Sequence, residues 1–214
     1  MVSFADELNS LLPPDIPNRP ALIEKASRHL DRIVEVNQVM NLTRITSPRE
    51  AAIKHVLDSV LPWALFQNAS HIADAGTGPG FPGVPLALLF PHTQFTLLDS
   101  TQKKARFVQS VVDELELDNV EVLPIRAEDW LRTRKTDILT GRAVAPLAKA
   151  IPLFARAPRM LLYKGPDAEL EIAEAQPEAR KRRLKLSIAL RYELPDGLGH
   201  RSIVQVAHAP AVLT

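Results

Sequence analysis

The sequence predicts an α/β fold: a doubly wound, mostly parallel sheet of seven strands, with an antiparallel C-terminal strand and an N-terminal helical extension. Three observations lead to this prediction. The first 68 residues carry helical periodicity, strand and helix patterns alternate from residue 71 onward, and two β-rich stretches close the chain. We therefore expect a helical extension over 1–68 and an α/β domain over 69–214, packed together as one compact unit.

The helical extension is predicted from apolar residues that recur with a period of about 3.6 residues. One such stripe, with Asn37 as a polar intruder, comprises Leu22, Ala26, Leu30, Ile33, Val34 and Asn37. The segment Ser47-Pro48-Arg49-Glu50 has the pattern of a capping box with proline at the first helical position. The helix that follows is expected to bury Ile53, Val56, Leu57, Val60 and Leu61.

The α/β domain is predicted from short apolar strands that alternate with helical segments. Helices are expected over 83–90 and 101–117, and strands over 71–75, 94–99, 119–124, 136–141 and 159–165. Two further β-rich stretches, 183–194 and 201–209, are separated by a turn at Pro195-Asp196-Gly197. Alternation followed by a hairpin indicates a mostly parallel sheet with one antiparallel strand near an edge.

Composition excludes several classes of protein. The chain has 26 Lys+Arg and 25 Asp+Glu, a formal charge of +1, so it is not a globally basic nucleic-acid binder. The absence of cysteine excludes disulfides, Cys-ligated zinc and a thiolate nucleophile. The N-terminal residues lack a secretory pattern, and no apolar run approaches the roughly 20 residues of a membrane span. We expect a cytoplasmic monomer that uses no metal.

Glycine is scarce except in one loop. The chain has 8 glycines, where average usage would give about 15, and four of them lie within Gly76–Gly83. Residues Gly78–Gly83 match the G-x-G-x-x-G dinucleotide pattern, but Pro79 and Pro82 lack the backbone N–H that a pyrophosphate needs. Asp74 would also repel a phosphate. An NAD-dependent oxidoreductase is therefore disfavoured.

A cationic cofactor fits the same loop. S-adenosylmethionine (AdoMet) carries an ammonium and a sulfonium and no phosphate, which suits Asp74 followed by Gly76 and Gly78. Asp99 ends the next strand, 23 residues after Gly76, where a carboxylate can accept hydrogen bonds from both ribose hydroxyls. Together these features indicate an AdoMet-dependent methyltransferase sheet. The structural alternatives are a tight glycine turn and a helix cap at Asp99.

The residues also restrict the methylation chemistry. Methylation of pyrimidine C5 requires a thiolate, and the chain has no cysteine. Methylation of an exocyclic amine commonly uses an Asn/Asp-Pro-Pro-aromatic motif after the fourth strand, where this chain has Thr140-Gly141-Arg142-Ala143. Guanine N7 is an acceptor that needs no deprotonation, so alignment for direct in-line transfer would suffice.

Several separated segments together resemble a known family. DAGTGPGFPGVPLALLFP, LLDSTQKKARFV, NVEVLPIRAED, GRAVAPL and LLYKG occur in this order, preceded by NLTRI and KHVLDSV. They are similar to the glucose-inhibited division protein B family, bacterial small-subunit rRNA guanine-N7 methyltransferases, over about residues 37–170. The resemblance implies AdoMet as methyl donor, no metal, and 16S rRNA or the small ribosomal subunit as partner, with guanine 527 as the target.

The resemblance also implies site residues. Gly76 and Phe81 would contact the cofactor from the first loop, and Phe81 is a candidate to stack on adenine or the target base. The other implied cofactor residues are Asp99 and Ser100 at the ribose, Ala127 and Glu128 at the adenine, and Arg142. Pro79 departs from the alanine that is usual in the family, which bears on the geometry of the loop.

Candidate RNA and catalytic residues lie near this edge. Lys103 and Lys104 begin a helix, where basic residues are unfavourable, so contact with RNA phosphate would explain them. Arg126 and Asn41 are further candidates for the RNA. Arg142, Arg126 and His55 are the candidate catalytic residues, and His55 shares a helix face with Asp58. A basic stretch over 180–191 is either a phosphate-contacting patch or a solvated strand edge.

Two alternative functions stay open at this stage. A small-molecule AdoMet methyltransferase would act without RNA and would leave the basic residues unexplained. A non-catalytic RNA-binding assembly protein would not bind AdoMet, which the set of Asp74, Gly76, Gly78 and Asp99 argues against.

Overall fold

The computed structural model describes residues 2–45 and 47–208, which form the α/β fold that the sequence predicts. Within these ranges seven strands make one sheet, in the order β3-β2-β1-β4-β5-β7-β6. The strands β1 to β5 are parallel, whereas β7 is antiparallel to both β5 and β6. Their bounds are β1 (His71–Ala75), β2 (Gln94–Leu98), β3 (Val120–Leu123), β4 (Ile138–Arg142), β5 (Arg159–Lys164), β6 (Leu184–Glu193) and β7 (His200–His208).

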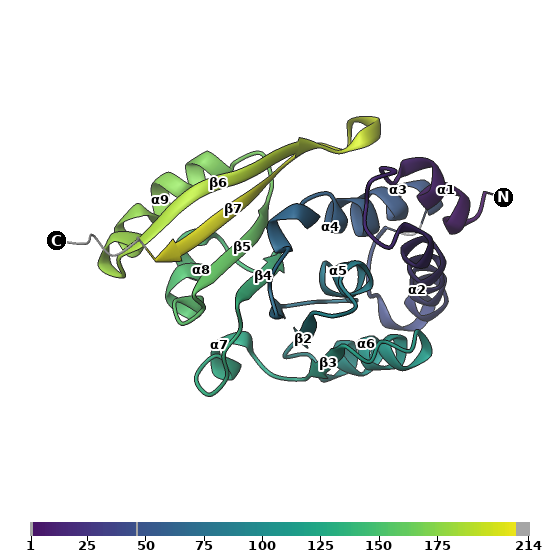
Figure 1. Ribbon diagram of the computed structural model, residues 1–214, viewed down its shortest axis with the longest axis horizontal. Coiled ribbons are helices and arrows are strands. Elements are labelled where there is room, and N and C mark those ends of the chain that lie inside the picture. Colours follow the sequence, from purple (N-terminus) through teal and green to yellow (C-terminus); the bar gives the residue numbers. More distant parts are fainter. Residues whose placement is uncertain (1, 46, 209–214) are drawn as a thin grey trace.

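Helices precede the sheet and connect its strands (Figure 1). Those before the sheet are α1 (Phe4–Leu11), α2 (Arg19–Met40), α3 (Pro48–Ala51), the π-helical η1 (Ala52–Leu57), α4 (Asp58–Val60) and the 3-10 turn η2 (Trp63–Phe66). Those within it are α5 (Gly83–Leu89), α6 (Gln102–Glu114), α7 (Ala127–Trp130), α8 (Leu147–Phe154), α9 (Ala168–Lys181) and the 3-10 turn η3 (Pro195–Gly197). Among the described residues, no helix has the length and apolar character needed to cross a membrane.

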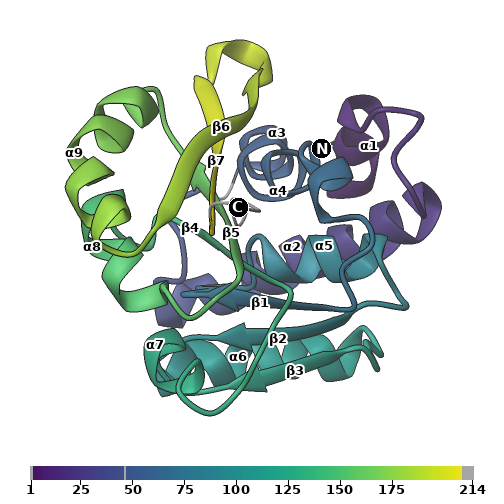
Figure 2. The ribbon, with the colours of Figure 1, turned by 60° about the vertical axis from the view of Figure 1, so that its left-hand side comes forward.

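Strand side chains alternate between the two faces of the sheet and so divide the core into two clusters. Ile72, Phe95 and Leu97 pack on one face with helices α1, α2, η1, α5 and α6. Ala73 and Leu139 pack on the other with α7, α8 and α9. Figure 2 shows α8 and α9 on one side of the strands β5 to β7, and α3 and α4 on the other. Helices therefore cover both faces, as a doubly wound sheet requires.

The helical extension shares its core with the sheet. Leu8 of α1, Leu30 of α2 and Val56 of η1 belong to the same buried cluster as the sheet residue Phe95. At the surface, the tip of the β6–β7 hairpin reaches toward α1 and α3 (Figure 1). There the Arg49 guanidinium donates to Asp196 at 2.5 Å and to Glu7 at 3.0 Å. These exposed ion pairs add little energy, so the shared apolar core holds the extension in place.

The capping box predicted at Ser47 is wrong. Pro48 does occupy the first helical position, but the Ser47 side chain caps no N–H among the described residues. Glu50 instead accepts a hydrogen bond from Lys54 Nζ at 2.7 Å, one turn further along. A reciprocal capping box does form at the start of α1, between Ser3 and Asp6. The capping box does not form at Ser47 because Glu50 makes a stronger, charge-assisted hydrogen bond with Lys54.

The helix after Ser47 also departs from α-helical geometry, since six of its residues form the π-helical segment η1. Four of its five predicted core residues, Ile53, Val56, Leu57 and Val60, are buried, whereas Leu61 is half-buried. Such π-helical turns occur frequently at functional sites. At the other end of the chain, the predicted strand 201–209 corresponds to β7, and Ala209 lies outside the described residues.

Candidate active site at the carboxyl edge of the sheet

Two pockets adjoin where the parallel strands end. The first, here called the Asp99 pocket, has a volume of about 310 Å³ and lies over the ends of β1, β2 and β4. The second, the Arg142 pocket, has a volume of about 530 Å³ and lies between the ends of β4 and β5 and the helical extension. Both are lined by Ala143 and Ala145, so the loop after β4 forms the partition between them.

The Asp99 carboxylate organises the first pocket. It is 8% exposed, and its two oxygens accept the backbone N–H groups of Gly78, at 3.1 Å, and Thr101, at 2.8 Å. A carboxylate can accept more than two hydrogen bonds, so capacity remains for a ligand. Gly76 has a φ of +67°, and a Cβ on Gly141 would lie 2.9 Å from the Ala75 carbonyl oxygen. The glycines therefore let the loops after β1 and β4 approach each other.

Asp74 supports the glycine loop from beneath. Its carboxylate is fully buried and accepts the Gly83 N–H at 2.9 Å, at the start of α5. Burial raises the pKa of Asp74 to about 7. A Cβ on Gly83 would lie 2.2 Å from Leu97 Cδ2 and 2.8 Å from the Asp74 carboxylate. Asp74 thus fixes the loop that borders the pocket and does not itself line the pocket.

Two ion pairs line the Arg142 pocket. Arg142 Nη1 donates to Asp58 Oδ2 at 2.9 Å, and Lys164 Nζ pairs with Glu171 Oε2 at 2.8 Å. Lys164 also donates to the Ala145 carbonyl oxygen at 2.6 Å, which holds the partition loop against β5. The pocket therefore has polar, charged walls, whereas the core beneath it is apolar.

Asp58 receives donors from three strands. Besides Arg142 at the end of β4, Tyr192 Oη of β6 donates to Oδ1 at 2.8 Å, and Arg201 Nε of β7 lies 3.6 Å from Oδ2. Arg142 Nη1 also donates to the Lys54 carbonyl oxygen at 2.7 Å. Burial and the neighbouring Asp58 charge raise the pKa of Tyr192, which keeps its hydroxyl a donor.

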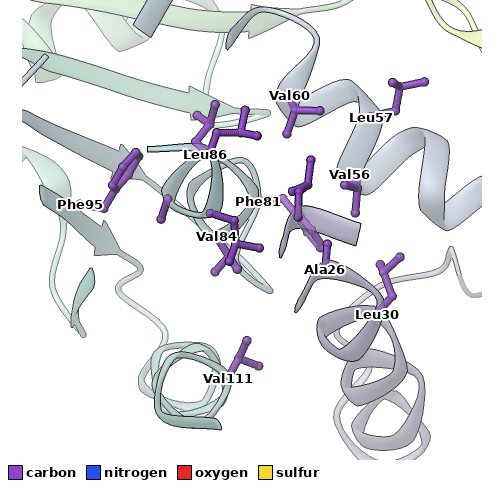
Figure 3. Packing of buried hydrophobic residues seen from close by; sticks show 14 of the residues in the cluster. Ala26, Leu30, Val56, Leu57, Val60, Phe81, Val84, Leu86, Phe95 and Val111 are labelled. Atoms are coloured by element: carbon purple, nitrogen blue, oxygen red, sulfur yellow. The ribbon is translucent and has the colours of Figure 1, made fainter. Parts of the chain in front are cut away.

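Phe81 connects the glycine loop to the helical extension. Its ring is stacked between His29 of α2, with centroids 4.8 Å apart, and His55 of η1, at 4.7 Å. Figure 3 shows Phe81 close to Ala26 of α2 and Val56 of η1. His29 Nε2 also lies 2.8 Å from the Pro79 carbonyl oxygen. Burial lowers the pKa of His29 to about 4, and burial followed by the Arg142 charge lowers that of His55 to about 3. Both rings are therefore neutral at pH 7.

Comparison with known sequences places the chain in a family. The family model described as GidB, rRNA small subunit methyltransferase G, matches residues 22–192. A ribosomal RNA small subunit methyltransferase G from Solibacter usitatus (strain Ellin6076) is 63% identical over 209 residues, which is 96% of this chain and 100% of that protein. The chain belongs to this family. A protein of the same name from Desulfitobacterium hafniense (strain Y51) is 38% identical over 192 residues, 86% of this chain and 80% of that protein.

Two solved structures share the fold of this chain. The cofactor-bound Rv0187 from MTB superimposes with a TM-score of 0.60 at 16% sequence identity, covering 92% of this chain and 98% of that one. The delta-N METTL16 MTase domain gives a TM-score of 0.58 at 12% identity, covering 86% of this chain and 97% of that one. At these identities the similarity concerns the fold alone.

The structure brings five of the nine predicted cofactor residues together. The Asp99 pocket is lined by Gly76, Asp99, Ser100, Ala127 and Glu128. Asp74 and Gly78 lie behind this lining and hold the loop and the Asp99 carboxylate. Arg142 lines the second pocket instead. Phe81 was expected to contact the cofactor, but its ring is 3% exposed and stacked between two histidines, so no free face remains for adenine.

Some of the predicted catalytic and RNA-binding residues lie at the Asp99 pocket, and others lie away from both pockets. Arg126 and Lys104 line the Asp99 pocket, and Lys103 is exposed beside it in the first turn of α6. His55 lines neither pocket, because it is buried against Phe81 and near Thr43 Oγ1. Asn41 is an exposed residue with positive φ at the end of α2. His55 thus occupies a structural position, the RNA contact of Asn41 stays a prediction, and the three basic residues lie at or beside the pocket.

Several polar residues of the site were missed from the sequence, among them His29, Lys164, Glu171 and Arg201. His29 could have been found, since it lies on the same helical stripe as Ala26, Leu30 and Ile33, and a histidine there is buried. Lys164 lies one residue before the end of the predicted strand 159–165, at the carboxyl edge of the sheet. Glu171 and Arg201 gave no signal, because their place at the Arg142 pocket depends on how α9 and β7 pack.

The buried His29 predicts a specific loss of stability in acid. Its pKa is about 4 in the folded protein, below the ordinary value of 6.5, so only the unfolded chain binds a proton between these values. The contribution of His29 to the free energy of unfolding is fully present above pH 6.5. It is lost as the pH falls toward 4. In urea titrations, acidification from about pH 7 to about pH 5 should cost the wild type about 2 kcal/mol more than the His29→Gln variant.

The matched control is His92→Gln, since His92 is exposed. This variant should show the same pH dependence as the wild type. An identical acid response of His29→Gln and wild type would contradict the neutral, buried state of His29.

Proposed function

We propose that this chain transfers a methyl group from AdoMet to N7 of one guanine in 16S rRNA, the guanine at position 527. The observation that supports this most directly is the pair of adjoining pockets separated only by the Ala143–Ala145 loop. In a member of this methyltransferase family, one pocket would hold the cofactor and the other the target base. In-line transfer would take place beside this loop, where sulfur, methyl group and N7 have to come into direct contact.

The Asp99 pocket fits AdoMet. Asp99 has carboxylate capacity left for ribose hydroxyls. Pro79 and Pro82 leave the glycine loop without two of the backbone N–H groups that a phosphate cradle needs. Two large apolar side chains at this pocket, Ile125 and Leu153, are 38% and 43% exposed, and a bound adenine ring would bury part of their apolar surface. When bound, AdoMet supplies an electrophilic methyl group on its sulfonium.

The neighbouring residues suit a transfer that needs no general base. Guanine N7 has a free lone pair at neutral pH, so the protein has only to hold this atom in line with the methyl group. His55 is neutral and enclosed, which leaves it the role of supporting Phe81 and the glycine loop. Arg142 lines the base pocket and can orient a base through guanidinium N–H groups.

Basic residues around the Asp99 pocket support an RNA substrate. Lys104 and Arg126 line the pocket, and Lys103 lies exposed in the same first turn of α6. Positive charge at a helix N-terminus is unfavourable in the free protein, and a phosphate at this position would compensate for it. The charges therefore fit an RNA backbone that crosses the mouth of the site while one base enters it.

Transfer to the rRNA can be tested directly. Purified protein with labelled AdoMet and small ribosomal subunits that lack base methylation should label one guanine of 16S rRNA at N7. The Asp99→Ala variant should bind AdoMet about 10- to 100-fold more weakly, the loss expected for hydrogen bonds to a charged group, and should recover at high AdoMet concentration. AdoMet binding without any label in 16S rRNA would disprove the proposal, and label on an exocyclic amine would disprove the N7 chemistry.

The RNA face can be tested by salt dependence. Replacing Lys103 with alanine should weaken binding to the small subunit. The negative slope of log affinity against log salt should become shallower by about 1, while AdoMet binding stays unchanged. The matched control is Lys135→Ala, because Lys135 is also exposed but precedes β4 at the opposite edge of the sheet. Equal salt slopes for both variants would show that the RNA does not cross α6.

A further inference from the structure

The Arg142 pocket contains a carboxylate with one oxygen available for a ligand. Glu171 lines this pocket, and its side chain is 25% exposed. Its Oε2 accepts the Leu147 N–H at 2.9 Å and pairs with Lys164 Nζ at 2.8 Å. Among residues 2–45 and 47–208, no donor bonds to Oε1. The carboxylate is thus fixed in orientation through one oxygen, with the other free to accept.

Arg142, which lines the same pocket, offers the complementary group. Both oxygens of Asp58 are occupied, by Arg142, Arg201 and Tyr192, and its side chain is only 2% exposed. Arg142 uses Nη1 for Asp58 and Lys54, and within the described part of the chain its other guanidinium N–H groups make no hydrogen bond. Among the described residues the pocket therefore presents a free side-chain acceptor, on Glu171, and free side-chain donors, on Arg142.

This arrangement matches guanine better than the other bases. Guanine has donors at N1 and at its 2-amino group, on the edge that pairs in a duplex, and acceptors at O6 and N7 on the other edge. A fixed acceptor oxygen can take hydrogen bonds from the donor edge. Adenine has an unprotonated N1 at the equivalent place, which a carboxylate oxygen would repel.

We propose that Glu171 recognises the target guanine by accepting hydrogen bonds from N1–H and the 2-amino group, and that Lys164 positions Glu171 for this contact. The inference rests on the proposed function and adds the residue that determines the specificity for guanine. A base held by its N1 edge at Glu171 has N7 on its opposite side, free to be directed toward the partition with the Asp99 pocket. Methylation by this chain is then selective for guanine without any contact to N7.

The Glu171→Gln variant tests this contact sharply. The Leu147 N–H and the Lys164 ammonium both need an acceptor, so the amide oxygen should take the place of Oε2. The amide NH₂ then takes the place of Oε1 and presents donors to the donors of guanine. Glu169→Gln is the matched control on the same helix, because Glu169 is exposed, pairs with Arg191 and does not line the pocket.

The measurement is single-turnover methylation of small subunits rebuilt with guanosine or inosine at the target position, since inosine lacks the 2-amino group. Wild type and Glu169→Gln should methylate guanosine at least about 10-fold faster than inosine, as expected for a hydrogen bond to a charged group. In Glu171→Gln the guanosine rate should fall about 10- to 100-fold, and the preference for guanosine should vanish or reverse. AdoMet affinity and melting temperature should match those of the control.

Three outcomes distinguish the possible failures. Absence of any labelled guanine with the wild-type protein would overturn the proposed function itself. Wild-type activity together with an unchanged rate and preference in Glu171→Gln would overturn the role of Glu171. A lower rate in Glu171→Gln with the guanosine preference retained would mean that Glu171 only supports the partition loop, and would equally overturn this inference.

Discussion

The active edge of this protein depends on one buried carboxylate, Asp58. It comes from the helical extension, and it takes hydrogen bonds from Arg142 of β4 and Tyr192 of β6, with Arg201 of β7 also close. A buried charge is tolerated only when it is paired, and loss of one partner typically costs several kcal/mol. Asp58 therefore fixes the extension to three strands of the sheet at the point where the Arg142 pocket opens.

The same extension holds the glycine loop through stacking. His29 and His55 enclose Phe81, and His29 also reaches the Pro79 carbonyl oxygen. Helices that precede the sheet in sequence thus set the position of both pockets, one through Asp58 and the other through Phe81. This explains why the extension shares its apolar core with the sheet, because an independent domain could not hold these contacts at fixed distances.

Much of this could be predicted from the sequence, since the mostly parallel sheet with its antiparallel strand follows from alternation and the C-terminal hairpin, and the carboxyl-edge site follows from Asp99 after β2. The predictions failed where long-range packing decides. Phe81 was expected to stack on adenine or the target base, but two histidines distant in sequence enclose it. Glu171 resembled any acidic residue in the first turn of a helix, and only the packing of α9 against α8 and β6 brings it to Lys164. Local sequence patterns predict the helices, the strands and the edge of the sheet that carries the site. Contacts between polar side chains of different elements can be identified only in the folded chain.

The central claim is that the two pockets separate cofactor from base across the loop after β4. A structure of the protein bound to the small ribosomal subunit with S-adenosylhomocysteine tests it most directly. The account predicts the nucleoside at Asp99 and one unstacked guanine in the Arg142 pocket, with its N1 edge at Glu171 and its N7 toward Ala143–Ala145. A target base bound outside the Arg142 pocket, or cofactor product in that pocket, would contradict it.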